Sequence, residues 1–223
     1  MSKEKDNKIL CSNLIICEGL DAKFYMVWFL RMLIKNDIRY EEFQAMDAGG
    51  NNDLPKFIKT LPDWPNFNSV KSITVVRDSE NDPKGASQSV QSIFKNNGFA
   101  VPDGPCKVAC PSAGQHNVKT GYALFPNFDS DIINGALEDL CLKTLASPNR
   151  EKILGIADSA VDLYKKQVSN LKRPHKNRLH TYLSLNDDFV GLKLGESATA
   201  NAFDFLDEQL QPLKDLLHTM LED

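Results

Sequence analysis

Two apolar runs in this chain end abruptly in carboxylates. The first, Leu14–Asp21, has the sequence LIICEGLD, and the second, Ile73–Asp82, has the sequence ITVVRDSEND. Runs of this kind predict strands buried in a parallel sheet, whose carboxyl ends meet at one crevice. Mg²⁺ prefers oxygen ligands, usually one or two carboxylates together with water and substrate phosphates. The pattern therefore predicts a divalent-metal site at which Glu18, Asp78 and Glu80 converge.

Other acidic residues near these strand ends have two interpretations. Asp78 and Glu80 are two positions apart, so extended backbone would project both side chains to the same side, with Asp82 following in the turn as a further metal ligand. Acidic residues also cap helices that follow strands, which could be the only role of Asp82, and we expect it for Asp21. Glutamate is a poor cap, so we interpret Glu18 as a ligand.

Strands and helices alternate along the first two thirds of the chain. Apolar periodicity and turn residues predict strands at 9–17, 40–46, 70–77 and 122–126, and helices at 22–35, 53–61, 85–97 and 132–145. Such alternation predicts right-handed βαβ units and a mostly parallel sheet. Residues 99–120, with their prolines and glycines, are expected to form a hairpin or an irregular excursion.

From residue 148 onward the periodicity is helical, over the ranges 151–171, 177–185 and 200–221. We therefore expect an α/β fold with three parts. These are a polar N-terminal tail at 1–8, an α/β domain at 9–147, and a helical C-terminal region at 148–223 packed on that domain.

Composition limits the classes of protein. The 223 residues suffice for one domain with a full core, and the net charge of −4 argues against a protein that coats nucleic acid. No apolar stretch is long enough for a membrane span, and the charged N-terminus does not resemble a signal peptide. Five scattered cysteines, an odd number, predict reduced thiols in a cytoplasmic protein.

The two carboxylate motifs resemble those of the Toprim domain, the magnesium-binding catalytic module of topoisomerases, bacterial primases, recombination proteins and the overcoming-lysogenization-defect (OLD) nucleases. The matching residues are the turn Glu18–Asp21 and the motif Asp78–Glu80, and the resemblance covers roughly residues 9–145. The second motif departs from the Toprim pattern, because it is Asp-x-Glu where Asp-x-Asp is usual. Over its whole length the chain most resembles a bacterial family of stand-alone Toprim-like proteins related to the OLD nucleases. The segments that carry this wider resemblance are Val75–Glu80, Leu124–Pro126, Gly135–Leu140 and Leu192–Gly195.

The resemblance implies a Toprim-like sheet and a nuclease, a phosphodiester hydrolase that acts on DNA or RNA with Mg²⁺ or Mn²⁺. Glu18 would be a metal ligand or general base, and Asp78 and Glu80 would be ligands of the first ion. Glu138 matches the acidic residue that completes a second metal site in OLD-type domains, although a helix dipole would also favour an acid in that first turn. Two alternatives stay open: a non-catalytic module that binds nucleic acid or a partner protein, and a small-molecule phosphoesterase.

Phosphate chemistry also needs positive charge near the metal. The densest basic segment is Leu171–His180, in which we expect Lys176 and Arg178 to bind phosphate and the other basic residues to be solvated. Arg77, next to Asp78, is expected to orient an acidic neighbour. The sequence does not decide the oligomeric state, the pathway or the choice between DNA and RNA.

Overall fold

The computed structural model describes residues 8–128, 133–168 and 171–222 of the chain. Of the tail expected at 1–8, only Lys8 lies within these residues. Among them, no helix has both the length and the apolar character needed to cross a membrane.

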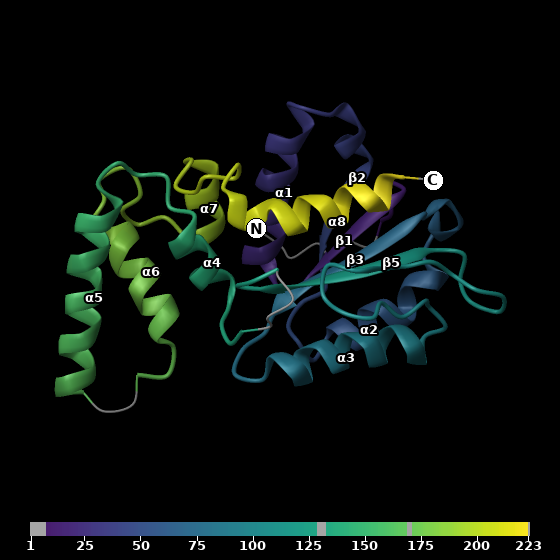
Figure 1. Cartoon of the computed structure of the whole chain (residues 1–223), viewed down its shortest axis with the longest axis horizontal. Helices are drawn as coiled ribbons and strands as arrows, with labels where there is room; N and C mark the ends of the chain where they lie inside the picture. The colour runs from purple at the N-terminus through teal and green to yellow at the C-terminus, as the bar shows by residue number, and fades with distance from the viewer. Residues whose placement is uncertain (1–7, 129–132, 169–170, 223) are drawn as a thin grey trace.

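A five-stranded sheet forms the centre of the molecule (Figure 1). Its strands are β1 (Asn13–Cys17), β2 (Phe43–Asp47), β3 (Ser72–Asp78), β4 (Val108–Ala109) and β5 (Lys119–Phe125), in the spatial order β2-β1-β3-β5-β4. The first four in that order are parallel, and only the two-residue β4 runs antiparallel to its neighbour β5. The predicted mostly parallel α/β sheet is therefore confirmed, and the irregular excursion contributes its antiparallel edge.

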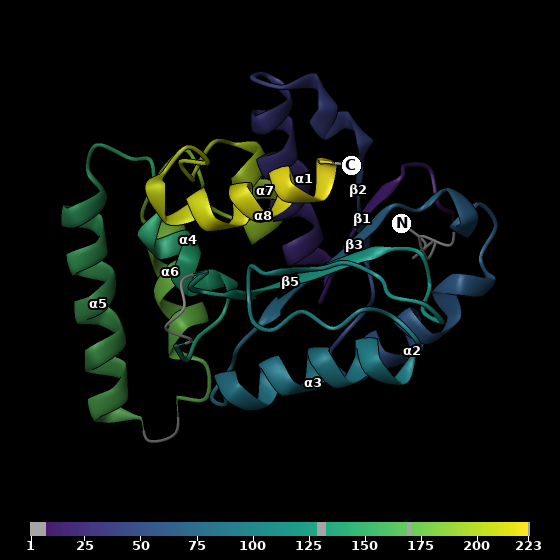
Figure 2. The same ribbon diagram turned by 45° about the vertical axis from the view of Figure 1, so that its right-hand side comes forward.

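Helices cover both faces of the sheet. They are α1 (Leu20–Ile34), α2 (Leu54–Thr60), α3 (Pro83–Asn96), α4 (Leu137–Lys143), α5 (Arg150–Gln167), α6 (Pro174–Ser184), α7 (Leu194–Thr199) and α8 (Gln211–Leu221). Figures 1 and 2 show α2 and α3 on one face and α1, α7 and α8 on the other. Helices α5 and α6 form a hairpin that projects beside α4, at the end of the sheet where the parallel strands finish. The helical C-terminal region is thus confirmed.

The alternation of side chains along each strand divides the interior into two apolar clusters. On β1, Leu14 and Ile16 face α2 and α3, whereas Ile15 and Cys17 face α1 and the C-terminal helices. Both sets are fully buried because helices cover both faces, and this explains why the strand is apolar without a break.

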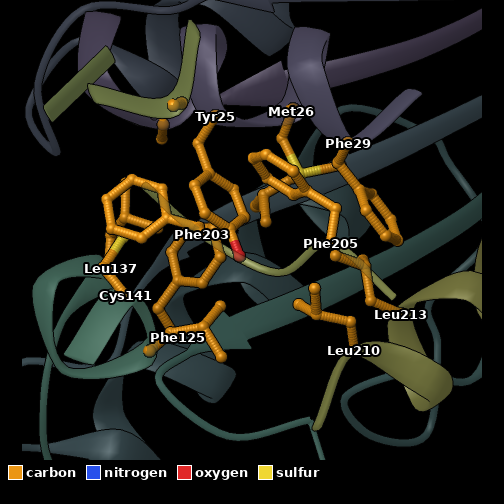
Figure 3. Close-up of a cluster of buried hydrophobic side chains, with 14 of the residues drawn as sticks. Tyr25, Met26, Phe29, Phe125, Leu137, Cys141, Phe203, Phe205, Leu210 and Leu213 are labelled. Carbon is orange, nitrogen blue, oxygen red and sulfur yellow. The ribbon is translucent and has the colours of Figure 1, made fainter. Parts of the chain in front are cut away.

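The larger cluster brings segments from opposite ends of the chain together (Figure 3). The ring of Tyr25 on α1 lies 6.3 Å from that of Phe125 on β5, in edge-to-face geometry, and 5.1 Å from that of Phe205. Leu137 and Cys141 of α4 lie in the same cluster. This packing fixes α4 next to the end of β5, and so fixes where the side chains of α4 can reach.

Two local expectations were wrong. The helix expected at 200–221 is α-helical only over α8, Gln211–Leu221. Before it lies a non-helical stretch in which Asn201 has a φ of 61° and Phe203 pairs with Leu145 as an isolated β-bridge. This stretch inserts Phe203 and Phe205 into the core. Asp21 does not cap α1, because the helix begins one residue earlier, at Leu20, and Asp21 lies in its first turn.

A close approach between α1 and α7 depends on Gly195. A Cβ added at this buried glycine would lie 2.8 Å from Cβ of Phe24 and 3.0 Å from its Cδ2. The Cβ of Phe24 is fixed to the backbone of α1, so it cannot turn away from the added methyl group.

We predict that Gly195→Ala lowers the free energy of unfolding by about 1–3 kcal/mol, the usual cost of overpacking a core, even though alanine is the better helix former. Urea denaturation measures the change. The matched control is Gly155→Ala on the exposed face of α5, where, among the described residues, no atom outside the helix's own nearby backbone lies within 4 Å of the added Cβ. It is expected to raise stability by roughly 0.5–1 kcal/mol. Equal effects of the two substitutions would contradict the packing described.

Candidate metal centre

Parallel pairing places Glu18 beside Arg77 at the strand ends. Cys17 of β1 pairs with Val76 of β3, and the next amide, Glu18 N–H, donates a 3.0 Å hydrogen bond to the carbonyl of Val76. Glu18 and Arg77 are therefore lateral neighbours on the same face. The following residue, Gly19, has a φ of 94°, a conformation that glycine adopts without strain, and this turn leads the chain from β1 into α1.

Arg77 is a buried cation, with 4% of its side chain exposed. Its Nε donates to the carbonyl of Asp78 at 3.3 Å, and its Nη1 lies 3.4 Å from Oγ of Ser89 on α3. The same Nε lies 3.2 Å from Oε2 of Glu18, an ion pair without hydrogen-bond geometry. The expectation that Arg77 orients an acidic neighbour is confirmed, and that neighbour is Glu18.

Asp78, the last residue of β3, is tied to the start of α4. Its Oδ1 accepts a 2.9 Å hydrogen bond from the N–H of Leu137. The buried hydroxyl of Ser79 donates to the carbonyl of Ile133 at 2.6 Å and lies 3.1 Å from that of Gly135. These bonds hold the segment before α4 against the end of β3. Ser79 was missed from the sequence, where a serine between two acids gives no signal of its own.

The structure corrects the expected geometry of Glu80. The strand ends at Asp78, and Glu80 has a φ of 54°, in the left-handed region that residues other than glycine rarely occupy. Its N–H and C=O exchange 2.8 Å hydrogen bonds with Gly135, which hold the backbone in this conformation. Glu80 is therefore an exposed side chain at the rim of the site, because extended backbone does not continue to this residue.

Glu138 reaches the same place from α4. Only 5% of its side chain is exposed, and its Oε1 forms a 2.9 Å ion pair with Nζ of Lys176 on α6. Its Oε2 is buried and has no hydrogen-bond partner among the residues that the structure describes. Two of the residues selected from distant parts of the sequence, Glu138 and Lys176, are thus in direct contact.

Burial and neighbouring charges raise the pKa of Asp78 to about 7. Burial is the main cause, and the negative charges of Glu138, Glu18 and Glu80 add to it, while the hydrogen bond from Leu137 opposes it. Burial also raises the pKa of Glu18, with Arg77 opposing and Glu80 contributing. The negative charges of these carboxylates are therefore only partly offset by the protein's own cations.

Burial alone would lower the pKa of Lys176, but the hydrogen bond and the charge of Glu138, together with Asp78, outweigh that effect and raise it. Lys176 thus stays protonated beside the carboxylates. With 36% of its side chain exposed, its ammonium group is also reachable from solvent.

The donor set fits a divalent cation. Glu18 Oε2 and Glu138 Oε2 are buried carboxylate oxygens without hydrogen-bond partners among the described residues, and Asp78 lies electrostatically coupled to both side chains. Leaving a buried acceptor unsatisfied costs roughly 1–3 kcal/mol, and more when it is charged, a cost that a cation would offset. No three His, Cys, Asp or Glu side chains within the described ranges are close enough to hold an ion as they stand. Binding would therefore require some of these carboxylates to change rotamer.

Two other predicted site residues have structural partners. Asp82 is the N-cap of α3, since its Oδ1 accepts a 2.9 Å hydrogen bond from Gly85 N–H. Arg178 forms a two-pronged ion pair with Asp158, which joins α6 to α5, with Nη2 2.8 Å from Oδ2. The metal role of Asp82 and the phosphate role of Arg178 stay predictions, and neither enters the site proposed below.

Comparison with known proteins gives one match. A family model described as a protein of unknown function (DUF3226) matches residues 12–222, nearly the whole chain. The chain belongs to this family. No curated protein and no solved structure matches it. The DUF3226 match spans the sheet, the carboxylate residues and the C-terminal helices.

We predict that Asp78 makes the stability of this DUF3226 protein fall as pH rises, in buffer containing EDTA. An acid whose pKa is raised by folding binds its proton more tightly in the folded state. Its stabilising effect is therefore present below the unfolded pKa of about 3.9 and is lost as pH rises through the folded pKa of about 7. The shift corresponds to a loss on the order of 4 kcal/mol between these limits.

Urea denaturation at pH 5 and pH 8 measures the larger part of this loss, since the first part of it occurs below pH 5. Asp78→Asn should remove most of the fall, since asparagine can still accept from Leu137 N–H. The matched control, Asp82→Asn, keeps a good N-cap and should show the wild-type fall. A fall in Asp78→Asn as steep as in wild type would show that Asp78 has no such pKa.

Proposed function

We propose that this chain is a divalent-metal-dependent phosphodiester hydrolase that acts on nucleic acid. The observation that carries the proposal is the burial of Asp78 within electrostatic reach of Glu138 and Glu18, which raises the pKa of Asp78 to about 7. Glu18 Oε2 and Glu138 Oε2 are buried without a hydrogen-bond partner among the described residues. Perturbed carboxylates of this kind gather at functional sites, although ion-pair networks produce them as well. The resemblance of the strand-end motifs to Toprim nucleases supports the same reaction.

Asp78, Glu18 and Glu138 would hold Mg²⁺ or Mn²⁺, with Glu80 at the exposed rim. The ion supplies Lewis-acid charge for the phosphate group. Arg77 keeps the carboxylate of Glu18 at the end of β1, and the hydrogen bonds of Asp78 and Ser79 keep α4 over the site. Lys176 places a second positive charge at the solvent-facing side, where a phosphate would arrive.

A second candidate is a non-catalytic module that binds nucleic acid or a partner protein. The observation that favours it is that two protein cations, Arg77 and Lys176, already form ion pairs with Glu18 and Glu138. Such pairs would stabilise a site that never takes up a metal. Cleavage and metal uptake separate the two functions.

We expect the purified protein to cleave labelled DNA or RNA oligonucleotides in Mg²⁺ or Mn²⁺ and to be inactive in EDTA. Asp78→Ala should lower the cleavage rate at least about a hundredfold, the typical cost of losing one group that stabilises transition-state charge. The control is Asp47→Asn at the end of β2, whose carboxylate accepts a 2.8 Å hydrogen bond from Gly49 N–H, and which should cleave normally. Absence of cleavage with every divalent ion and substrate would favour the non-catalytic module.

A further inference from the structure

The contact between Glu138 and Lys176 bears on how many ions the site can hold. Oε1 of Glu138 is 2.9 Å from the ammonium nitrogen of Lys176, which is therefore the direct counter-ion of this oxygen. Oε2 is buried without a partner among the described residues. One oxygen of Glu138 thus remains for a metal ion, and a protein cation already occupies the other.

The charges around Asp78 lead to the same count. Among the described residues, the carboxylates coupled to Asp78 are Glu138, Glu18 and Glu80, and two ion pairs join Arg77 to Glu18 and Lys176 to Glu138. With these four acids ionised, this group has an excess of two negative charges over its two ion-pair partners, which equals the charge of one divalent ion. A second divalent ion would leave the site with an excess of positive charge and would compete with Lys176 for Glu138.

We propose that Lys176 is a built-in substitute for a second metal ion, so that the centre takes up a single divalent ion. This inference rests on the proposed function and specifies how its site is assembled. In two-ion sites the ions lie roughly 3.5–4 Å apart and both neutralise the phosphate. Here one of those charges is supplied by a lysine on α6. Lys176 is protonated and partly exposed, so its ammonium group reaches both Glu138 and an incoming phosphate.

The position of Lys176 also links the metal centre to the α5–α6 hairpin. Lys176 is in the first turn of α6, and Arg178, two residues further on, holds α6 to Asp158 of α5. The hairpin therefore contributes a charge to the site that the sheet and α4 do not supply themselves.

Counting bound Mn²⁺ tests the inference without any measurement of cleavage. The free Mn²⁺ signal in electron paramagnetic resonance, or calorimetry, gives the number of ions per chain at pH 8. Wild type is expected to bind one ion. Lys176→Gln keeps a hydrogen-bond donor for Glu138 but removes the charge, and it is expected to bind two.

Two variants serve as controls. Lys176→Arg keeps the charge and should bind one ion. Arg178→Gln removes the same charge two residues along the same helix, away from the carboxylates, and should also bind one ion.

The outcomes separate this inference from the proposed function. Two ions in wild type would overturn the proposal that Lys176 takes the place of a second ion, but would not contradict the metal-dependent hydrolase. One ion in both wild type and Lys176→Gln would also overturn it. No ion in wild type would overturn both. The wild-type count remains decisive if Lys176→Gln does not fold.

Discussion

The hydrogen bond from Leu137 N–H to Asp78 Oδ1 is the contact on which the candidate site depends. It joins the end of a central strand to the beginning of α4, and the bonds of Ser79 and Glu80 to the segment before α4 reinforce it. Without this connection Glu138 would not lie over Asp78, because nothing in β3 itself specifies where a helix some 60 residues later should begin. The apolar packing of Leu137 and Cys141 under the same helix holds it from the other side.

That arrangement has an electrostatic cost, which indicates a function. Burying a carboxylate among other carboxylates disfavours its charged form, and the high pKa of Asp78 expresses this cost. Arg77 and Lys176 offset part of it, but Glu18 Oε2 and Glu138 Oε2 remain without hydrogen-bond partners among the described residues. A fold selected only for stability would gain by replacing such groups with apolar ones. An excess of buried negative charge is what a cation-binding site has when no ion is bound.

The sequence predicted the parts of the site that depend on local pattern. Apolar runs that end in acids located the ends of β1 and β3, and parallel pairing then made Glu18 and Arg77 neighbours. The backbone of Glu80 could not be predicted, since its left-handed conformation is imposed by the bridge to Gly135, a residue more than fifty positions away. The same is true of the Glu138–Lys176 pair, whose members were selected for separate roles. Their contact depends on how α6 packs on α4, which periodicity does not specify. The late start of α8 also escaped prediction, because tertiary packing of Phe203 and Phe205 into the core decides the backbone before it.

The central claim is that Asp78 lies in an uncompensated carboxylate cluster that accepts a divalent ion. The most direct test is to measure the pKa of Asp78 by NMR of its ¹³C-labelled side-chain carboxyl. The variant Asp78→Asn assigns the signal. In EDTA the signal should titrate with a pKa of about 7, and saturating Mg²⁺ should move that pKa to well below its ordinary value, since bound cations favour the ionised form. An ordinary aspartate pKa of about 4 in EDTA, or a titration that Mg²⁺ leaves unchanged, would contradict the claim.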